Sequence, residues 1–223
     1  LLSNLTQEKL DKINFPWLTH KEASLCDEIC RILKVSYAGE KGYEIHVANE
    51  KMLKIYHEII KSGKEYNLSH FGMLALDSMR LEKNYRSWKS DLTSDFTILQ
   101  SGLKRWLNLS KENFIGKDSL KRELEIGVTK TFVTLIVEDP EENEPFGEPV
   151  YLSPVFSGDN YLGPIVSSGY GHRVKKSISM AILDNKILQG LNDQIYIEVL
   201  GRKRKASIVK QALYDPENNK LRS

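Results

Sequence analysis

The sequence has little of what would place it in several large classes of protein. Two cysteines, Cys26 and Cys30, are too few for a disulfide scaffold, and their C-x-x-x-C spacing differs from the redox C-x-x-C. We expect inert thiols in a reducing compartment. No apolar run approaches the roughly 20 residues that cross a bilayer. The formal net charge of +2 gives no general attraction to nucleic acid or to anionic membranes. These features predict a globular, cytoplasmic protein without nucleic-acid or membrane partners.

Several motifs of cofactor and metal chemistry are also missing. Gly169-Tyr170-Gly171 lacks the third glycine and the helix of a dinucleotide-binding fingerprint, and no phosphate-binding G-x-x-x-x-G-K-[ST] occurs. The five histidines stand too far apart for a helical metal pair, and no G-x-S-x-G elbow is present. By themselves, the residues predict no metal site, no flavin or nicotinamide site and no serine nucleophile.

The first part of the chain, up to about residue 127, has a mixed pattern. Gly39-Glu40-Lys41-Gly42 predicts a turn between two strands, because glycine tolerates positive φ. The expected elements are a weak helix over 1–10, extended chain over 24–47, and helices over 49–63, 69–83 and 110–122. The helix that Asn49 caps and Gly63 ends has one predicted apolar stripe, made of Met52, Leu53, Tyr56, Ile59 and Ile60.

From Thr131 onward, short strands separated by turn residues dominate the pattern. The expected strands are 132–137, 149–152, 165–168, 178–183, 195–200 and 206–211, with turns at Pro145-Phe146-Gly147 and Gly190-Leu191-Asn192-Asp193. This rhythm is typical of a small antiparallel β-barrel or sandwich. The predicted fold class is therefore α+β, with a mixed domain over 1–127 and an all-β domain over 128–223.

The most distinctive polar cluster is Ser36-Tyr37-Ala38-Gly39-Glu40-Lys41-Gly42-Tyr43-Glu44. Two strands joined by its glycine turn would hold Tyr37 and Glu44 near each other at the open end of a hairpin. An aromatic face beside a fixed carboxylate suits a flat heterocycle whose edge carries adjacent N–H donors. The alternative, which the residues alone favour, is an ordinary hairpin with solvated glutamates.

A second cluster, over residues 80–91, interleaves aromatic and cationic residues just past a helix end. It predicts a pocket wall in which Tyr85 packs on a ligand and Arg86 meets an anionic tail. The alternative is a charged helix terminus whose Arg80 and Glu82 form surface or interdomain ion pairs. The basic run Arg202-Lys203-Arg204-Lys205 has no interleaved aromatic residue and predicts a solvated hairpin tip.

Five motifs in this order resemble those of the glycine-cleavage T-protein (aminomethyltransferase) family, and most closely the folate-binding C-terminal region of dimethylglycine and sarcosine dehydrogenases. The first two are Phe15-Pro16-Trp17-Leu18-Thr19 and the cluster from Tyr37 to Glu44. The third is Ser78-Met79-Arg80-Leu81-Glu82-Lys83-Asn84-Tyr85-Arg86-Ser87-Trp88, followed by Asp91-Leu92-Thr93 and Phe114-Ile115-Gly116-Lys117. Gly163-Pro164-Ile165-Val166-Ser167-Ser168-Gly169 with Lys175-Lys176-Ser177-Ile178, and the terminal Tyr214-Asp215-Pro216, complete the resemblance over nearly the whole chain.

The resemblance implies part of a folate-binding domain, built around a central channel and closed by a C-terminal β-barrel. It implies tetrahydrofolate as the cofactor and 5,10-methylenetetrahydrofolate as the product, with a small N-methylated amine or aminomethyl donor as partner. FAD is implied only if a flavin domain precedes this chain in the same polypeptide, and a mitochondrial-matrix location only in a eukaryote. The implied folate-binding residues are Glu44 on the pterin edge, Tyr37 and Tyr85 along the channel, Thr19 close by, and Arg86 and Trp88 from their places in the motif.

The chain also departs from the family pattern. The family's catalytic aspartate comes from a half that precedes Phe15-Pro16-Trp17, and this sequence lacks that half and opens on Leu1 rather than on methionine. We therefore expect a fragment and predict no catalytic residue in it. Leu76 stands where cleavage-system T-proteins carry an arginine, which favours the dehydrogenase branch. Three alternatives remain: folate-dependent demethylation of another methyl donor such as a sulfonium compound, a non-catalytic module, and an inactive structural fragment.

Overall fold

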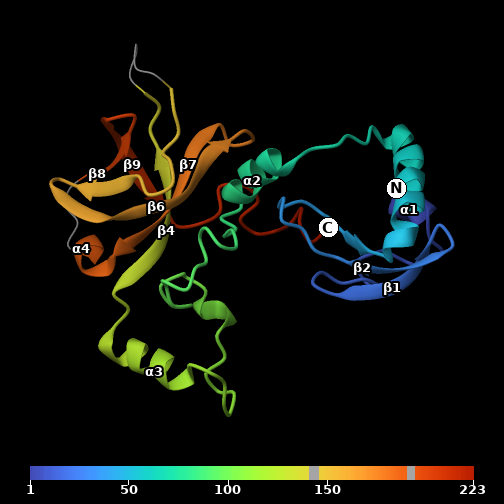
Figure 1. The fold of residues 1–223 in the computed structure, drawn as a ribbon, viewed down its shortest axis with the longest axis horizontal. Helices are drawn as coiled ribbons and strands as arrows, with labels where there is room; N and C mark the ends of the chain where they lie inside the picture. The colour runs from blue at the N-terminus through green and yellow to red at the C-terminus, as the bar shows by residue number, and fades with distance from the viewer. Residues whose placement is uncertain (141–145, 190–193) are drawn as a thin grey trace. The chain divides into compact units, whose positions relative to one another are not determined.

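The chain forms two compact units in the computed structural model, which describes residues 1–140, 146–189 and 194–223 (Figure 1). Unit 1 consists of Leu1–Lys83 and Asp215–Ser223, and unit 2 consists of Asn84–Tyr214. The predicted domain boundary near residue 127 falls inside unit 2, where helical chain gives way to a barrel, and stays a prediction. The predicted turn over 190–193 and Pro145 of the other predicted turn lie outside the described residues.

Unit 1 is built on a three-stranded antiparallel sheet in the order β1 (His20–Leu25), β2 (Glu28–Leu33) and β3 (Glu44–His46). Side chains alternate between the two faces of a strand. One face is buried, and its core consists of Ala23, Leu25, Cys30 and Ile32 together with Leu10, Phe15 and Ile55. The two thiols of this unit are free, and burial raises the pKa of both Cys26 and Cys30; their predicted inertness stays a prediction.

Two expectations for the start of unit 1 are wrong. Residues 1–10 contain the short 3-10 helix η1 (Leu2–Asn4) instead of an α-helix. Side-chain oxygens compete for the backbone there: Thr6 accepts the N–H of Glu8 at 3.2 Å, and Asp11 accepts the N–H of Ile13 at 2.9 Å. Strands β2 and β3 do not form a tight hairpin either, because residues 34–43 connect them and Tyr37 lies in this connection rather than in a strand.

The helices of unit 1 are α1 (Asn49–Gly63), the 3-10 helix η2 (Lys64–Tyr66) and α2 (Met73–Glu82). Helix α1 ends at Gly63 as predicted, but Ala48, not Asn49, occupies its N-cap position. The predicted stripe is wrong for much of its length, because Met52 and Leu53 are 58% and 61% exposed. The apolar side chain that α1 buries fully is Ile55. The sheet therefore covers only part of the apolar arc of α1.

The charged end of α2 is buried rather than a surface feature. Arg80 and Glu82 are 2% and 1% exposed. Nε of Arg80 donates to Oδ1 of Asp77 at 2.7 Å, one turn earlier in the helix. Of the alternative interpretation, a charged helix terminus with surface or interdomain ion pairs, the surface form is therefore wrong.

Unit 2 begins with irregular chain that contains the 3-10 helix η3 (Lys104–Trp106) and helix α3 (Lys117–Ile126), which starts later than the predicted helix over 110–122. A closed antiparallel barrel follows, in the order β4-β7-β6-β5-β8-β9. Its strands are β4 (Lys130–Val137), β5 (Pro154–Ser157), β6 (Asn160–Gly171), β7 (Lys176–Asp184), β8 (Ile195–Val199) and β9 (Arg202–Val209), with the short helix α4 (Asn185–Gln189) after β7. This architecture confirms the predicted fold class, a mixed part followed by an antiparallel barrel.

Two details of the barrel differ from the prediction. Residues 149–152 form a turn rather than a strand, in which the N–H of Ser153 donates to the carbonyl of Val150 at 2.9 Å, and the strand β5 lies just after it. The basic run follows the turn at Leu200-Gly201, and Arg202, Lys203 and Lys205 are exposed as predicted. Arg204 is the exception: it is 6% exposed, lies in β9 opposite Ile197, and donates from Nη1 to the carbonyl of Gly147 at 2.9 Å. A long guanidinium side chain can be buried where a carbonyl receives its charge.

Candidate functional site

One end of the unit 1 sheet gathers several predicted site residues. In the register of the sheet, His20 lies opposite Leu33, and Leu33 lies opposite Glu44. Thr19 immediately precedes His20, so Thr19 and Glu44 lie at the same end of the two outer strands. Because neighbouring strands are about 4.8 Å apart, these strands are roughly 10 Å apart at this end. The connection 34–43, which carries Tyr37, leaves and re-enters the sheet at this end too.

Glu44 presents a carboxylate that is open to solvent. Its side chain is 59% exposed, and Oε2 lies 3.4 Å from Nε2 of His46, two residues along the same face of β3. An ionised carboxylate has about four lone-pair positions for hydrogen bonds. Glu44 therefore keeps the capacity to accept two adjacent N–H groups from a ligand edge.

Thr19 is held at the beginning of β1 by its own hydroxyl group. Oγ1 donates to the carbonyl of Pro16 at 2.6 Å, and the Thr19 carbonyl accepts the N–H of Lys34 at 3.0 Å. With its proton committed to Pro16, the hydroxyl faces a ligand as an acceptor.

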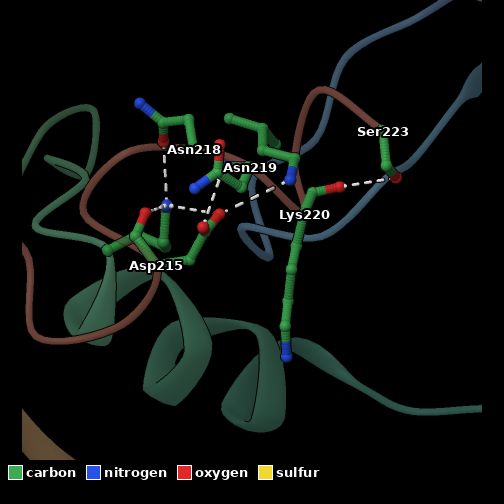
Figure 2. Close-up of polar contacts among 7 residues, drawn as sticks. Asp215, Asn218, Asn219, Lys220 and Ser223 are labelled. Carbon is green, nitrogen blue, oxygen red and sulfur yellow. Dashed lines mark hydrogen bonds and ion pairs between the residues drawn. The ribbon is translucent and has the colours of Figure 1, made fainter.

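The connection that carries Tyr37 is positioned by Lys83, at the end of α2. Gly39 has a φ of +77°, and a Cβ added to it would lie 2.5 Å from Cδ of Lys83. Nζ of Lys83 donates to the carbonyl of Asp215 at 2.6 Å and to Oδ1 of Asn218 at 2.8 Å; Figure 2 shows the turn that these two acceptors form. The glycine is therefore required because a buried lysine stem passes beside it.

The other three predicted residues, Tyr85, Arg86 and Trp88, belong to unit 2, so the six predicted residues fall into two groups. Nε of Arg86 donates to the carbonyl of Ser101 at 2.7 Å, and its guanidinium carbon lies 4.1 Å from the centroid of the Phe132 ring. Burial lowers the pKa of Arg86, although the residue keeps its charge at any physiological pH. Tyr85 is half-buried, and Trp88 is 76% exposed.

Two buried residues near these groups carry no signal in the sequence pattern. Lys34 follows β2 and is 0% exposed, and its Nζ has no hydrogen-bond partner among the described residues. Asp91 is also 0% exposed; it accepts the N–H of Ser87 at 2.7 Å and the hydroxyl of Ser167. Asp91 thus joins the turn after Ser87 to the barrel strand that carries Ser167. Lys83 is a further buried residue without a signal in the local sequence pattern, because its part in the site depends on contacts with residues that are distant in sequence.

The described residues show neither a metal centre nor a membrane span. Within residues 1–140, 146–189 and 194–223, no group of His, Cys, Asp and Glu is arranged to hold a metal ion. None of the helices in that part of the chain has the length and apolarity required to cross a membrane.

The chain combines an α+β unit, with an exposed carboxylate at one end of its sheet, and a closed antiparallel barrel. Comparison with known proteins shows which family has this combination. Residues 1–111 match the GCVT N-terminal domain, and residues 130–215 match the glycine cleavage T-protein C-terminal barrel domain. The chain belongs to the glycine-cleavage T-protein (aminomethyltransferase) family.

The relatives include both dehydrogenases and aminomethyltransferases. It is 30% identical over 218 residues to mouse (Mus musculus) mitochondrial dimethylglycine dehydrogenase, a match that covers 96% of this chain and 24% of the relative. It is 29% identical over 214 residues to the aminomethyltransferase of Caldanaerobacter subterraneus, covering 96% of this chain and 55% of the relative. The chain thus spans about a quarter or about half of the length of these relatives.

A solved structure supports the fold. The aminomethyltransferase T of the Bartonella henselae glycine cleavage system superposes with a TM-score of 0.69 at 21% identity, over 84% of this chain and 50% of that one. At this identity the likeness concerns the fold alone.

Proposed function

We propose that this chain is the tetrahydrofolate-binding part of a one-carbon transferase, of the kind that forms 5,10-methylenetetrahydrofolate in a dimethylglycine- or sarcosine-dehydrogenase-like protein. The observation that carries the proposal is the gathering of Thr19, Tyr37 and Glu44 at one end of the unit 1 sheet, in a chain of the aminomethyltransferase family. The amine donor, a flavin domain with FAD, and a location in the cytoplasm or mitochondrial matrix belong to the same proposal for the longer protein.

The exposed groups suit a reduced pterin. Such a ring is flat and carries adjacent N–H donors on one edge, which the solvent-open carboxylate of Glu44 accepts as a pair. Tyr37, at 37% exposed, offers a ring for packing. Tyr85, Arg86 and Trp88 of unit 2 are proposed as further folate-binding residues; for Arg86 this role would add to its contacts with Ser101 and Phe132.

No residue of the chain is given the proton-transfer role. Asp77 is engaged with Arg80, and Asp91 is buried between Ser87 and Ser167, so neither carboxylate is positioned as a free general base. The chain's own contribution is to bind and orient the folate, while the reacting carboxylate is expected from outside it.

The test is calorimetric titration of tetrahydrofolate into the chain, alone and joined behind the first half of an aminomethyltransferase relative. Glu44→Gln should weaken binding roughly ten- to a hundred-fold, because a charged hydrogen-bonding partner contributes about 1.5–3 kcal/mol. Glu22→Gln is the matched control: Glu22 is exposed, lies on β1, the other outer strand of the same sheet, and pairs with Arg31 at 3.0 Å. If both variants bind as the wild type does, Glu44 has no role in the site.

Two alternatives have distinct outcomes. If neither protein binds tetrahydrofolate, a non-catalytic module of the same fold replaces the proposal. If the longer protein binds it but transfers one-carbon units from a sulfonium compound rather than from N-methylglycines, the function is demethylation of another donor.

A further inference from the structure

Unit 2 contains a cavity of about 410 Å³ beside helix α3, within the range of small-molecule sites. Helix α3 lies outside the barrel (Figure 1). It contributes residues spaced three and four apart, from Ser119 to Ile126, so one face of the helix forms one wall. Residues of the stretches 97–100 and 127–129 form the remaining wall. The cavity therefore belongs to unit 2 alone.

Hydrogen bonds join the three stretches of chain that border the cavity. Oγ1 of Thr97 donates to Oε1 of Glu123 on the helix at 2.8 Å, and it accepts the N–H of Gln100 at 3.1 Å. Nε2 of Gln100 donates to Oγ1 of Thr129 at 3.3 Å. The helix, the segment before it and the segment after it are thus held together around the cavity.

Two adjacent residues bring opposite charges to the lining. Among the described residues, the half-buried carboxylate of Glu123 is engaged through Oε1 alone, so Oε2 can accept from a ligand. The neighbouring Arg122 is exposed and lines the same cavity. Consecutive Cα atoms are about 3.8 Å apart. The cavity is therefore bordered by an anion and a cation that lie side by side on one helix.

The charges next to the lining are balanced as well. Thr129 is followed by Lys130, whose Nζ lies 5.2 Å from the centroid of the Phe96 ring. On the other side, Asp95 precedes Thr97 by two residues and accepts the hydroxyl of Thr93 at 3.0 Å. Neither a purely anionic nor a purely cationic ligand is favoured by this surrounding, whereas a ligand with both charges is.

The lining also offers apolar surface that a ligand would cover. Leu120 is half-buried, and Ile126 is 77% exposed. Gly127 follows with a φ of +102°, and a Cβ added to it would have no atom of the described residues within 4 Å other than its chain neighbours. An aliphatic side chain of a ligand therefore has room beside Ile126, and its burial there would add hydrophobic stabilisation.

We propose that this cavity binds a free α-amino acid with an aliphatic side chain. Its ammonium group donates to Oε2 of Glu123, its carboxylate accepts from Arg122, and its side chain packs on Leu120 and Ile126. In an amino acid both charged groups are attached to one carbon atom, which matches charges presented by adjacent residues of a helix. Within the described part of the chain, the cavity shares no residue with the proposed folate site, so the proposal does not depend on the proposed function.

The experiment is titration of the full chain with leucine, followed by calorimetry and by ligand-observed NMR. Three analogues each lack one recognised feature: isoamylamine has no carboxylate, 4-methylpentanoate has no ammonium group, and glycine has no side chain. Leucine should bind saturably, and each analogue should bind about five-fold more weakly or worse, because each loses a charged hydrogen bond or the apolar contact.

Variants of the two charged residues assign the contacts. Glu123→Gln keeps an oxygen for the hydroxyl of Thr97 and should weaken leucine about ten-fold, while 4-methylpentanoate binds as before. Arg122→Gln should weaken leucine roughly two- to five-fold, because an exposed cation contributes less, and leave isoamylamine unchanged. Glu125→Gln and Lys121→Gln are the matched controls: both residues are exposed on α3 and lie outside the lining, so leucine should bind to these variants as to the wild type.

The proposal is overturned if leucine shows no saturable binding, or if glycine or either charged analogue binds as tightly as leucine does. Leucine binding that is unchanged in both Glu123→Gln and Arg122→Gln overturns it too. Glu44→Gln, in unit 1, should leave the leucine titration unchanged. Failure of the leucine titration and failure of the folate titration are therefore distinguishable.

Discussion

The stem of Lys83 fills the space that a side chain at Gly39 would need, so that a Cβ there would lie 2.5 Å from Cδ of Lys83. At the far end of the stem, Nζ reaches the carbonyl of Asp215 at 2.6 Å. One buried side chain therefore connects the loop of Tyr37, the end of α2 and the C-terminal segment. Lys83 and Asp215 are also the residues at which the chain leaves and re-enters unit 1. Their contact therefore joins the two ends of unit 1 at which the chain continues into unit 2.

Lys83→Met should destabilise unit 1 substantially. The substitution keeps the apolar stem but leaves Asp215, with a side chain 8% exposed, and Asn218 without their shared donor. Removing one member of a buried charged contact costs about 3 kcal/mol or more. Urea unfolding measures this change, and Lys61→Met, on a 77% exposed side chain, is the control that should stay within about 0.5 kcal/mol. A similar small effect for both variants would contradict the structural role of Lys83.

Gly39→Ala should destabilise the protein through two separable effects, backbone strain and steric overlap. Alanine at a φ of +77° is strained by about 1–2 kcal/mol, and its Cβ overlaps the Lys83 stem. Shortening that stem in Lys83→Ala removes the overlap but not the strain. A double-mutant cycle should therefore show that Gly39→Ala costs less in the Lys83→Ala background, by about 1 kcal/mol or more. Additive effects would show that the two residues do not share the space.

Much of the fold follows from local patterns in the sequence. Short β-prone runs bounded by turn residues predict the barrel strands β4, β7 and β8; β8 alternates between more and less buried residues, whereas residues 177–183 of β7 are all buried. The motif over 36–44 likewise locates the candidate site. The prediction fails where long-range contacts enter: residues 34–43 form a connection rather than a tight hairpin, and Gly39 within it lies against the stem of Lys83, which is distant in sequence.

The site could be predicted only in outline for a similar reason. Sequence spacing places Tyr37 near Glu44, but it does not show that Arg86 is engaged by Ser101 and Phe132. Burial of charged groups such as Lys34 and Asp91 depends on packing that no local pattern records. The same is true of the uncovered part of α1, because periodicity predicts an apolar arc but not what covers it.

Lys34→Met should stabilise the protein at neutral pH. Burial lowers the pKa of Lys34, the nearby Lys41 and Lys12 lower it further, and Asp11 opposes them. Nζ has no hydrogen-bond partner in the part of the chain that is described, so the charged form carries a desolvation cost that methionine lacks. We expect a gain of about 1–3 kcal/mol, measured by urea unfolding at pH 7.

The pH dependence supplies an independent check on Lys34. Because its pKa is lower in the folded than in the unfolded state, the unfolded chain binds more protons between these two values. The stability of the wild type should therefore rise with pH up to the ordinary lysine pKa, relative to that of Lys34→Met. Comparing the two proteins cancels the other titrating groups. Parallel stability curves would show that Lys34 is solvated, and Lys12→Met is the control for a general loss of positive charge.

The two apolar ridges of α1 should respond differently to truncation. Ile55 and Ile59 are four residues apart and pack on the core, whereas Met52 and Tyr56 form the adjacent ridge and are 58% and 45% exposed. Ile55→Ala should cost about 2–5 kcal/mol, because it opens a cavity in a closely packed site. Leu53→Ala, on the 61% exposed side, should stay within about 0.5 kcal/mol.

Urea unfolding of these two variants at equal chain concentration measures how far the sheet covers α1. Both substitutions remove apolar atoms from the same helix and introduce alanine, which has the same helix propensity in both variants. The difference in unfolding free energy therefore reports the apolar area that each side chain buries. If Leu53→Ala proved as costly as Ile55→Ala, the second ridge would be covered in solution, by another copy of the chain or by rearrangement of unit 1. A tenfold dilution distinguishes these explanations, because only a contact between copies weakens with concentration.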